Sequence, residues 1–207
     1  MLTGRRIDDR IVDRWEQLLC AAIAHRTGRP MMFFRDGQAE GGMLRDAWYI
    51  DPVLASVASL RPCRSGYCTR FEPDGESVRL WTGMGVLQDA VLGECLRSAL
   101  AQPQYRLSLK PLFRKLDATG FVGQGSWVRS FFTGQDGAQI RLTSASLEQA
   151  PSLYAPLDDR AVFSVMTVER LYKTADELEL DTDHVAEQLL RDFGPLYNGL
   201  FPRSALR

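Results

Sequence analysis

The sequence predicts an α+β fold in one domain spanning residues 1–207, with a mainly antiparallel sheet built from hairpins and long helices at the N-terminus, in the middle and at the C-terminus. Three observations support this fold class. Stretches rich in β-branched and aromatic residues occur in pairs around turns that contain Asp-Gly. Apolar residues at helical spacing mark both ends of the chain. No regular alternation of strand and helix, which would require a parallel sheet, is present.

The first helix is expected close to the N-terminus. Asp8 and Asp9 suit its N-terminal end, where negative charge is stabilised, while Gly28 and Pro30 indicate where it stops. Its apolar residues recur every three or four positions, as on the buried face of an amphipathic helix. This stripe consists of Ile7, Ile11, Trp15, Leu18, Leu19, Ala22 and Ile23. We therefore expect the stripe to pack on the sheet and to bury Trp15.

Three hairpins are expected from the turn residues. The first covers residues 31–51 and turns at Asp36-Gly37, and the second turns at Pro73-Asp74-Gly75. The third covers residues 126–145 and turns at Gln135-Asp136-Gly137. Residues 161–169 are β-branched and apolar enough to form a central strand.

The other segments between the ends of the chain are shorter. Residues 52–60 are compatible with a short helix, and residues 85–103 predict a helix that ends at Pro103. Residues 105–109 are interpreted as a short strand and residues 111–117 as a helical turn that begins at Pro111. Residues 146–159, with two prolines, are expected to form a long loop or an internal boundary.

The last helix is expected from residue 181 onward, and Gly194-Pro195 should kink or end it. Acidic residues alternate just before it, at Glu177, Glu179, Asp181 and Asp183. In an extended strand these carboxylates would share one face and could hold a hard cation. The favoured interpretation is a solvated face that leads into a helix N-terminus, since no glycine-shaped loop organises the oxygens.

Composition and charge exclude several classes of protein. The chain is 45% hydrophobic and 25% charged, which is typical of a globular protein. The net charge of −1 excludes a general electrostatic affinity for nucleic acid, although residues 1–150 carry +3 and residues 151–207 carry −4. Arginine far outnumbers lysine, which favours a GC-rich coding sequence of the bacterial type and fits anion recognition less directly.

A cytoplasmic protein without a membrane segment is expected. Acidic residues follow Arg5 and Arg6 where a secretory signal would need an apolar region, and no apolar run is long enough to span a membrane. The four cysteines are too few for a disulfide-stapled scaffold, so a reducing compartment is the simplest interpretation.

The cysteines and histidines give only weak indications of chemistry. Cys63 and Cys68 have a spacing seen in metal-ligand pairs, but a closed zinc site needs four ligands. A structural role is favoured over zinc or a regulatory disulfide, and no cofactor is expected. Neither His25 nor His184 lies beside a nucleophile in a recognisable motif, so an imidazole-dependent hydrolase is disfavoured. An enzyme whose catalytic residues are dispersed along the chain remains a third interpretation.

The strongest functional indication is a basic and aromatic region at residues 106–132. If residues 126–132 form a strand, Trp127 and Arg129 share a face, and a surface on which bases stack and phosphates pair can result. The candidate nucleic-acid-binding residues are Arg106, Lys110, Arg114, Lys115, Trp127 and Arg129. The favoured function is therefore a non-catalytic binding protein or accessory subunit for an anionic partner, with nucleic acid preferred over an acidic protein.

An alternative function follows from the order of the elements. Helix, two strands, short helix, strands, helix, strands and a terminal helix loosely resemble the layout of ligand-sensing domains of the PAS and GAF type. That resemblance implies a small-molecule pocket between the sheet and the helices.

Overall fold

The computed structural model describes residues 4–38, 44–52, 65–86, 95, 98–119, 131–133, 139–141, 144–145, 147–149 and 163–200. Within these ranges the elements, in chain order, are α1 (Asp9–Thr27), β1 (Met32–Gln38), β2 (Arg45–Ile50), β3 (Ser65–Asp74), β4 (Ser77–Val86), α4 (Pro103–Thr119), β5 (Phe131–Thr133), β6 (Gln139–Arg141), the 3₁₀ helix η1 (Leu147–Gln149), β7 (Phe163–Tyr172), α6 (Ala175–Leu180) and α7 (Thr182–Leu200). The predicted α+β class is confirmed.

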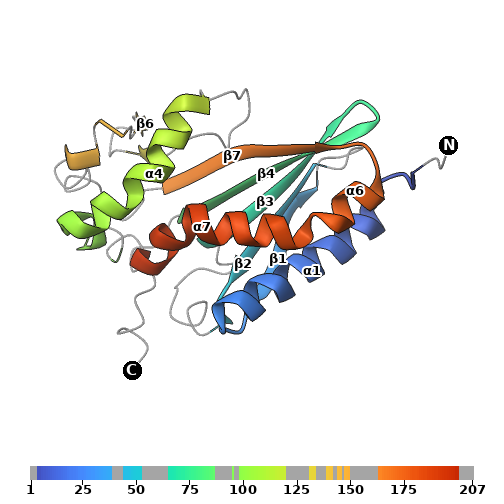
Figure 1. Cartoon of the computed structure of the whole chain (residues 1–207), viewed down its shortest axis with the longest axis horizontal. Coiled ribbons are helices and arrows are strands. Elements are labelled where there is room, and N and C mark those ends of the chain that lie inside the picture. Colours follow the sequence, from blue (N-terminus) through green and yellow to red (C-terminus); the bar gives the residue numbers. More distant parts are fainter. Residues whose placement is uncertain are drawn as a thin grey trace.

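The main sheet is antiparallel throughout. Its five strands follow the order β1-β2-β3-β4-β7, so four consecutive strands form a meander and β7 returns to pair with β4. Helices α1 and α7 lie side by side across one face of this sheet, and α4 packs at the C-terminal end of α7 (Figure 1). The short β5–β6 pair forms a separate sheet.

The hairpin predictions are correct in outline and wrong in two details. Strands β3 and β4 turn at Gly75, whose φ of 63° is the left-handed conformation that glycine adopts without strain. The pair Asp36-Gly37, however, lies inside β1, where the register shifts between Asp36 and Gln38. A β-bulge therefore stands where a turn was expected, because pairing with β2 continues past this point. The segment predicted to form a central strand is β7, which lies at one end of the strand order of the main sheet, so its predicted central position is wrong.

Two helix predictions are also corrected. Residues 105–109, expected as a strand, belong to α4, which runs through Pro111. A proline inside a helix removes one backbone hydrogen bond, and packing can offset that loss. Here Leu109, Leu112 and Phe113 are buried and pack α4 against the rest of the protein. Of the two outcomes expected at Gly194-Pro195, a kink or the end of the helix, the second is wrong, because α7 continues through Pro195 to Leu200.

Other expectations concern segments that the structure describes only in part. Residues 53–60 lie outside the described residues, as do most of the predicted helix at residues 85–103 and most of residues 146–159. Strands β5 and β6 pair as the third predicted hairpin requires, with Phe132 opposite Ile140. Glu177 and Glu179 lie in α6, Asp181 is its C-cap residue and Asp183 lies in the first turn of α7, so the extended arrangement of these four carboxylates is wrong.

Helix α1 forms for the reasons that its sequence suggests. The Asp8 carboxylate caps it by accepting hydrogen bonds from the backbone N–H groups of Arg10 and Ile11, and Gly28 ends it with a φ of 63°. Most of the predicted stripe is buried, although Leu18 is 42% exposed. The stripe thus packs on the sheet as expected.

Trp15 lies at the centre of this packing. Its side chain is fully buried, and its ring packs against that of Phe71 of β3 in a T-shaped arrangement at a centroid distance of 5.0 Å. The indole Nε1–H donates a hydrogen bond of 3.0 Å to the carbonyl of Leu178 in α6. One side chain therefore joins α1 to the sheet and to the segment that leads into α7.

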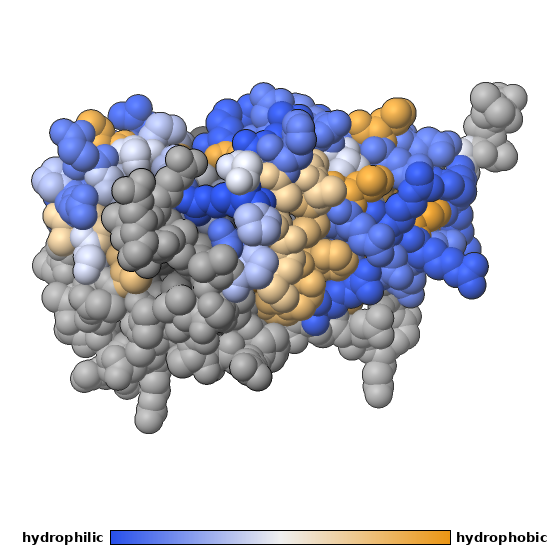
Figure 2. Space-filling view, turned by 90° about the horizontal axis from the view of Figure 1, so that it is seen from below, coloured by the Kyte–Doolittle hydropathy of each residue, from blue (hydrophilic) through white to orange (hydrophobic). Residues whose placement is uncertain are grey.

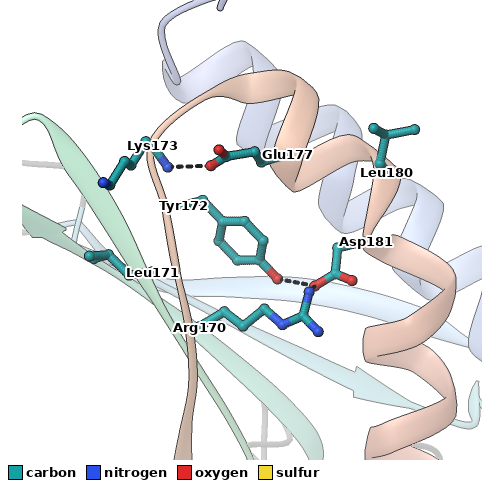
Figure 3. Close-up of a pocket in the computed structure, with 7 residues that line it drawn as sticks. All are labelled: Arg170, Leu171, Tyr172, Lys173, Glu177, Leu180 and Asp181. Atoms are coloured by element: carbon teal, nitrogen blue, oxygen red, sulfur yellow. Dashed lines mark hydrogen bonds and ion pairs between the residues drawn. The ribbon is translucent and has the colours of Figure 1, made fainter.

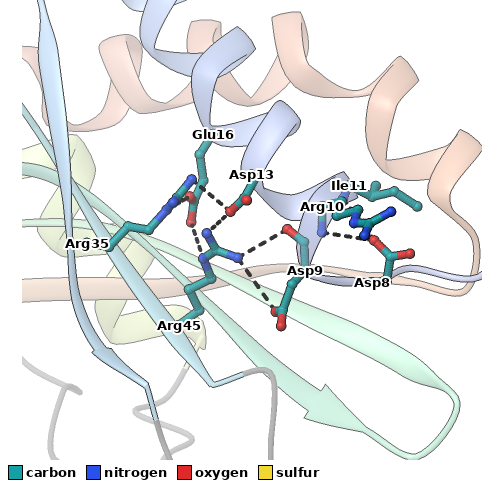
Figure 4. A network of polar contacts seen from close by, with 8 residues as sticks. All are labelled: Asp8, Asp9, Arg10, Ile11, Asp13, Glu16, Arg35 and Arg45. Carbon is teal, nitrogen blue, oxygen red and sulfur yellow. Dashed lines mark hydrogen bonds and ion pairs between the residues drawn. The ribbon is translucent and has the colours of Figure 1, made fainter.

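A cluster of charges joins α1 to β1 and β2 (Figure 4). The Glu16 carboxylate is fully buried and pairs with Arg35 at 2.7 Å and with Arg45 at 3.3 Å. Asp13 contacts both arginines, and Arg45 also donates to the carbonyl of Asp9 at 3.2 Å. Because Arg45 is only 4% exposed, two opposite charges are withdrawn from water together.

Burial raises the pKa of Glu16, while its hydrogen bond with Arg35 and the charge of Arg45 act in the opposite direction. The carboxylate therefore depends on both arginines to remain ionised inside the protein.

Among the residues that the structure describes, the large apolar side chains on the surface are dispersed. Figure 2 shows a face that is hydrophilic over its right-hand part, with isolated hydrophobic residues and a central band of moderate hydropathy. Within the described ranges, the exposed large hydrophobic side chains lie on different elements and are Leu18, Met32, Leu107, Leu171 and Leu180. Scattered residues of this kind are normal on protein surfaces. Among the described helices, none combines the length and hydrophobicity that crossing a membrane requires.

We expect Trp15→Ala to lower the free energy of unfolding by about 3–5 kcal/mol, because it removes a fully buried ring and leaves a cavity. Trp15→Phe keeps most of the packing and should lose about 1 kcal/mol, the typical net value of one hydrogen bond. Urea unfolding followed by circular dichroism measures both variants. A loss below about 1 kcal/mol for Trp15→Ala would contradict the central role of this side chain.

We expect Arg45→Ala to lower the free energy of unfolding by about 3–5 kcal/mol, because Glu16 is then left buried with one partner fewer. The loss should be larger near pH 8 than near pH 5. Removing Arg45 raises the pKa of Glu16 further above its unfolded value, and such a carboxyl loses stability as the pH rises through the folded pKa.

The control for this prediction is Arg26→Ala, which breaks the exposed Arg26–Asp183 pair and should cost no more than about 1 kcal/mol at either pH. Urea unfolding at the two pH values is the measurement. An equal loss for Arg45→Ala at both would show that Glu16 is not the group left uncompensated.

Candidate functional site

Helix α4 presents one apolar and one cationic side. Leu109, Leu112 and Phe113 are buried, and the Tyr105 hydroxyl donates a hydrogen bond of 3.0 Å to the carbonyl of Leu196 in α7. These contacts fix the orientation of the helix. The predicted site residues Arg106, Lys110 and Arg114 follow one another at intervals of four and lie on one stripe. We call these three residues the cationic stripe.

Arg106 is the most firmly held cation of the stripe. Its Nη1 donates hydrogen bonds to the backbone carbonyls of Leu100 at 2.7 Å and Ala101 at 3.0 Å, and its side chain is 11% exposed. These carbonyls belong to the segment just before α4. The guanidinium is therefore positioned by the backbone, whatever else binds to it.

Glu148 of η1 reaches the cationic stripe from a distant part of the sequence. Its Oε1 lies 2.8 Å from Lys110 Nζ, and its Oε2 lies 3.4 Å from Arg106 Nε. The hydrogen bonds from Lys110 and Arg106 lower the pKa of Glu148. This carboxylate therefore remains an anion at neutral pH and partly neutralises two of the three cations.

The remaining predicted site residues divide into three cases. Lys115 pairs with Asp192 of α7 and so helps to dock α4, which places it off the cationic stripe. Arg114 is exposed and has no ion pair among the residues that the structure describes. Trp127 and Arg129 lie outside the described residues, so the aromatic part of the predicted surface stays a prediction. The structure thus brings Arg106, Lys110 and Arg114 together.

A shallow depression of about 450 Å³ lies between the end of β7 and α6 (Figure 3). At its floor the Arg170 guanidinium and the Tyr172 hydroxyl both contact the Asp181 carboxylate, at 2.6 and 2.7 Å. Leu171 and Leu180 stand on opposite sides of these groups. These polar groups bind one another, and their contacts link β7 to the residue that precedes α7. We call this contact the Arg170–Asp181 clamp.

The space between the sheet and the helices is filled by side chains. Trp15, Leu19 and Ile23 of α1 and Phe193 of α7 are fully or almost fully buried there, together with Tyr49 and Phe71 of the sheet. A pocket of the kind implied by the PAS and GAF layout would have to occupy this volume. The described part of the interface offers core packing instead.

The cysteines and histidines do not converge in the described part of the chain. Cys20 and Cys68 are buried free thiols, and burial raises the pKa of each. Cys63 lies outside the described residues. His25 and His184 are exposed, in the last turn of α1 and the first turn of α7. No group of three metal-ligating side chains occurs among the residues described.

Sequence reasoning did not identify Glu148 or the Arg170–Asp181 clamp. Glu148 is 38 residues from Lys110, in a segment expected to be loop, and nothing in its local sequence points to α4. Asp181 was considered with the acidic segment, but its partners come from β7. Each pair becomes apparent only from the contacts in the three-dimensional structure.

Comparisons with protein-family models, with curated proteins and with solved structures found no match.

Proposed function

We propose that the protein is a binding protein that contacts the phosphate backbone of a nucleic acid through the cationic stripe of α4. The carrying observation is geometric: three cations repeat at intervals of four residues along one side of a docked helix, with Arg114 exposed and Arg106 and Lys110 partly buried. Successive cations are separated by about 6 Å along the helix axis, so the stripe extends over about 12 Å. A polymer with regularly repeated anions suits such a row better than a single small anion.

The surroundings of the stripe support this proposal. Residues 103–115 contain no acidic residue, so the helix itself supplies no competing carboxylate there. Arg106 and Lys110 already contact one carboxylate, and this contact supports the proposal that the pair can receive an oxyanion. Leu107 is 55% exposed beside the stripe and offers apolar contact to a sugar or base.

The test is fluorescence anisotropy with a labelled single-stranded oligonucleotide over a series of salt concentrations. Three cations on a single strand should give a log–log slope near −2, from the ~0.7 counterions released per phosphate. Arg114→Ala should weaken binding to all sequences alike and reduce the magnitude of the slope by about 0.7.

Arg10→Ala is the matched control, because it removes an exposed helical arginine from α1 and changes the net charge equally. The control should bind like the wild type. Equal loss in both variants would overturn the proposal by showing that only net charge matters, and so would the absence of wild-type binding at low salt. If labelled poly-glutamate binds and the oligonucleotide does not, the proposed partner becomes an acidic protein instead of a nucleic acid.

A further inference from the structure

Glu148 lies between two cations of the cationic stripe. Its two carboxylate oxygens are divided between Lys110 and Arg106, at 2.8 and 3.4 Å. A phosphate group presents oxygens to two neighbouring cations in the same manner. The carboxylate thus occupies the place between these two cations where an oxyanion can contact both of them.

The two sides of this contact differ in how firmly they are held. Arg106 keeps its position through two backbone carbonyls and is 11% exposed, so the cation does not depend on Glu148 for its orientation. The Glu148 side chain is 53% exposed and projects from a single turn of 3₁₀ helix. Its neighbour Leu147 is fully buried and anchors that turn. The carboxylate can thus leave by side-chain rotation while both elements stay in place.

We propose that Glu148 is an internal competitor that occupies the anion-binding position between Arg106 and Lys110 and is displaced when a phosphate backbone binds the cationic stripe. This inference rests on the proposed function of α4. Displacement of Glu148 breaks a partly exposed ion pair, which is a weak interaction. The contact therefore lowers the affinity for the phosphate backbone without preventing binding. It also discriminates against weakly charged ligands, because only a ligand that replaces the carboxylate at both cations recovers the lost contacts.

The test measures oligonucleotide binding by Glu148→Gln, which keeps the shape of the side chain and removes its charge. Loss of an exposed ion-pair competitor should tighten binding about two- to fivefold. Glu187→Gln is the control, since it removes an exposed carboxylate from α7 that has no ion pair among the described residues. Thermal unfolding of both variants checks that the fold is retained.

A double-mutant cycle with Lys110→Ala separates competition from a general change in electrostatic field. If Glu148 competes for Lys110, Lys110→Ala should cost little in the wild type and markedly more in Glu148→Gln. Independent effects of the two substitutions would show that Glu148 acts through its field alone and would overturn the proposal. Equal affinities of Glu148→Gln and Glu187→Gln would overturn it as well.

The outcomes also separate this proposal from the one on which it depends. Binding that requires Arg114 but does not respond to Glu148→Gln removes the competitor and leaves the cationic stripe. If neither the wild type nor Glu148→Gln binds the oligonucleotide at low salt, both proposals fall.

Discussion

The arrangement of the molecule depends on the burial of Trp15. Its ring packs on Phe71 of β3, and its indole N–H is bonded to the backbone of α6, so a single side chain sets the distance between α1, the sheet and the start of α7. A buried indole without a partner for its N–H would be costly. The bond to Leu178 removes that cost and makes the position of α6 part of the same core.

The residue next to Trp15 fixes the other side of the helix. Glu16 is buried against Arg35 and Arg45, which come from neighbouring strands of the hairpin β1–β2. Apolar contacts allow a helix to slide by small amounts, whereas a buried charge must meet its partners in one geometry. Hydrophobic packing therefore attaches α1 to the sheet, and the ion cluster specifies where along the sheet it sits.

Helix α4 joins this core to the proposed binding surface. Its apolar side, together with Tyr105 and Lys115, fastens it to α7, so the opposite side is presented on a rigid support. The cations there are not free of the protein's own anions, since Glu148 bridges two of them. Under the proposed function, a surface that is partly self-neutralised in this way would select anions that compete well with Glu148.

The sequence by itself determined the fold class, the N-terminal helix with its buried tryptophan, and the hairpin around Gly75, because these features depend on local periodicity and turn chemistry. It also grouped Arg106, Lys110, Arg114, Lys115, Trp127 and Arg129 as one candidate site, of which the structure places the first three on one stripe of α4. Tertiary structure alone decided that residues 105–109 are helical, that Asp36-Gly37 is a bulge, and that Glu148 faces Lys110. In each case the deciding contact lies on a distant segment: α7 packs on α4, β2 pairs beyond the bulge, and η1 meets α4. Local propensity carries no information about such partners, and their burial or pairing energy exceeds it.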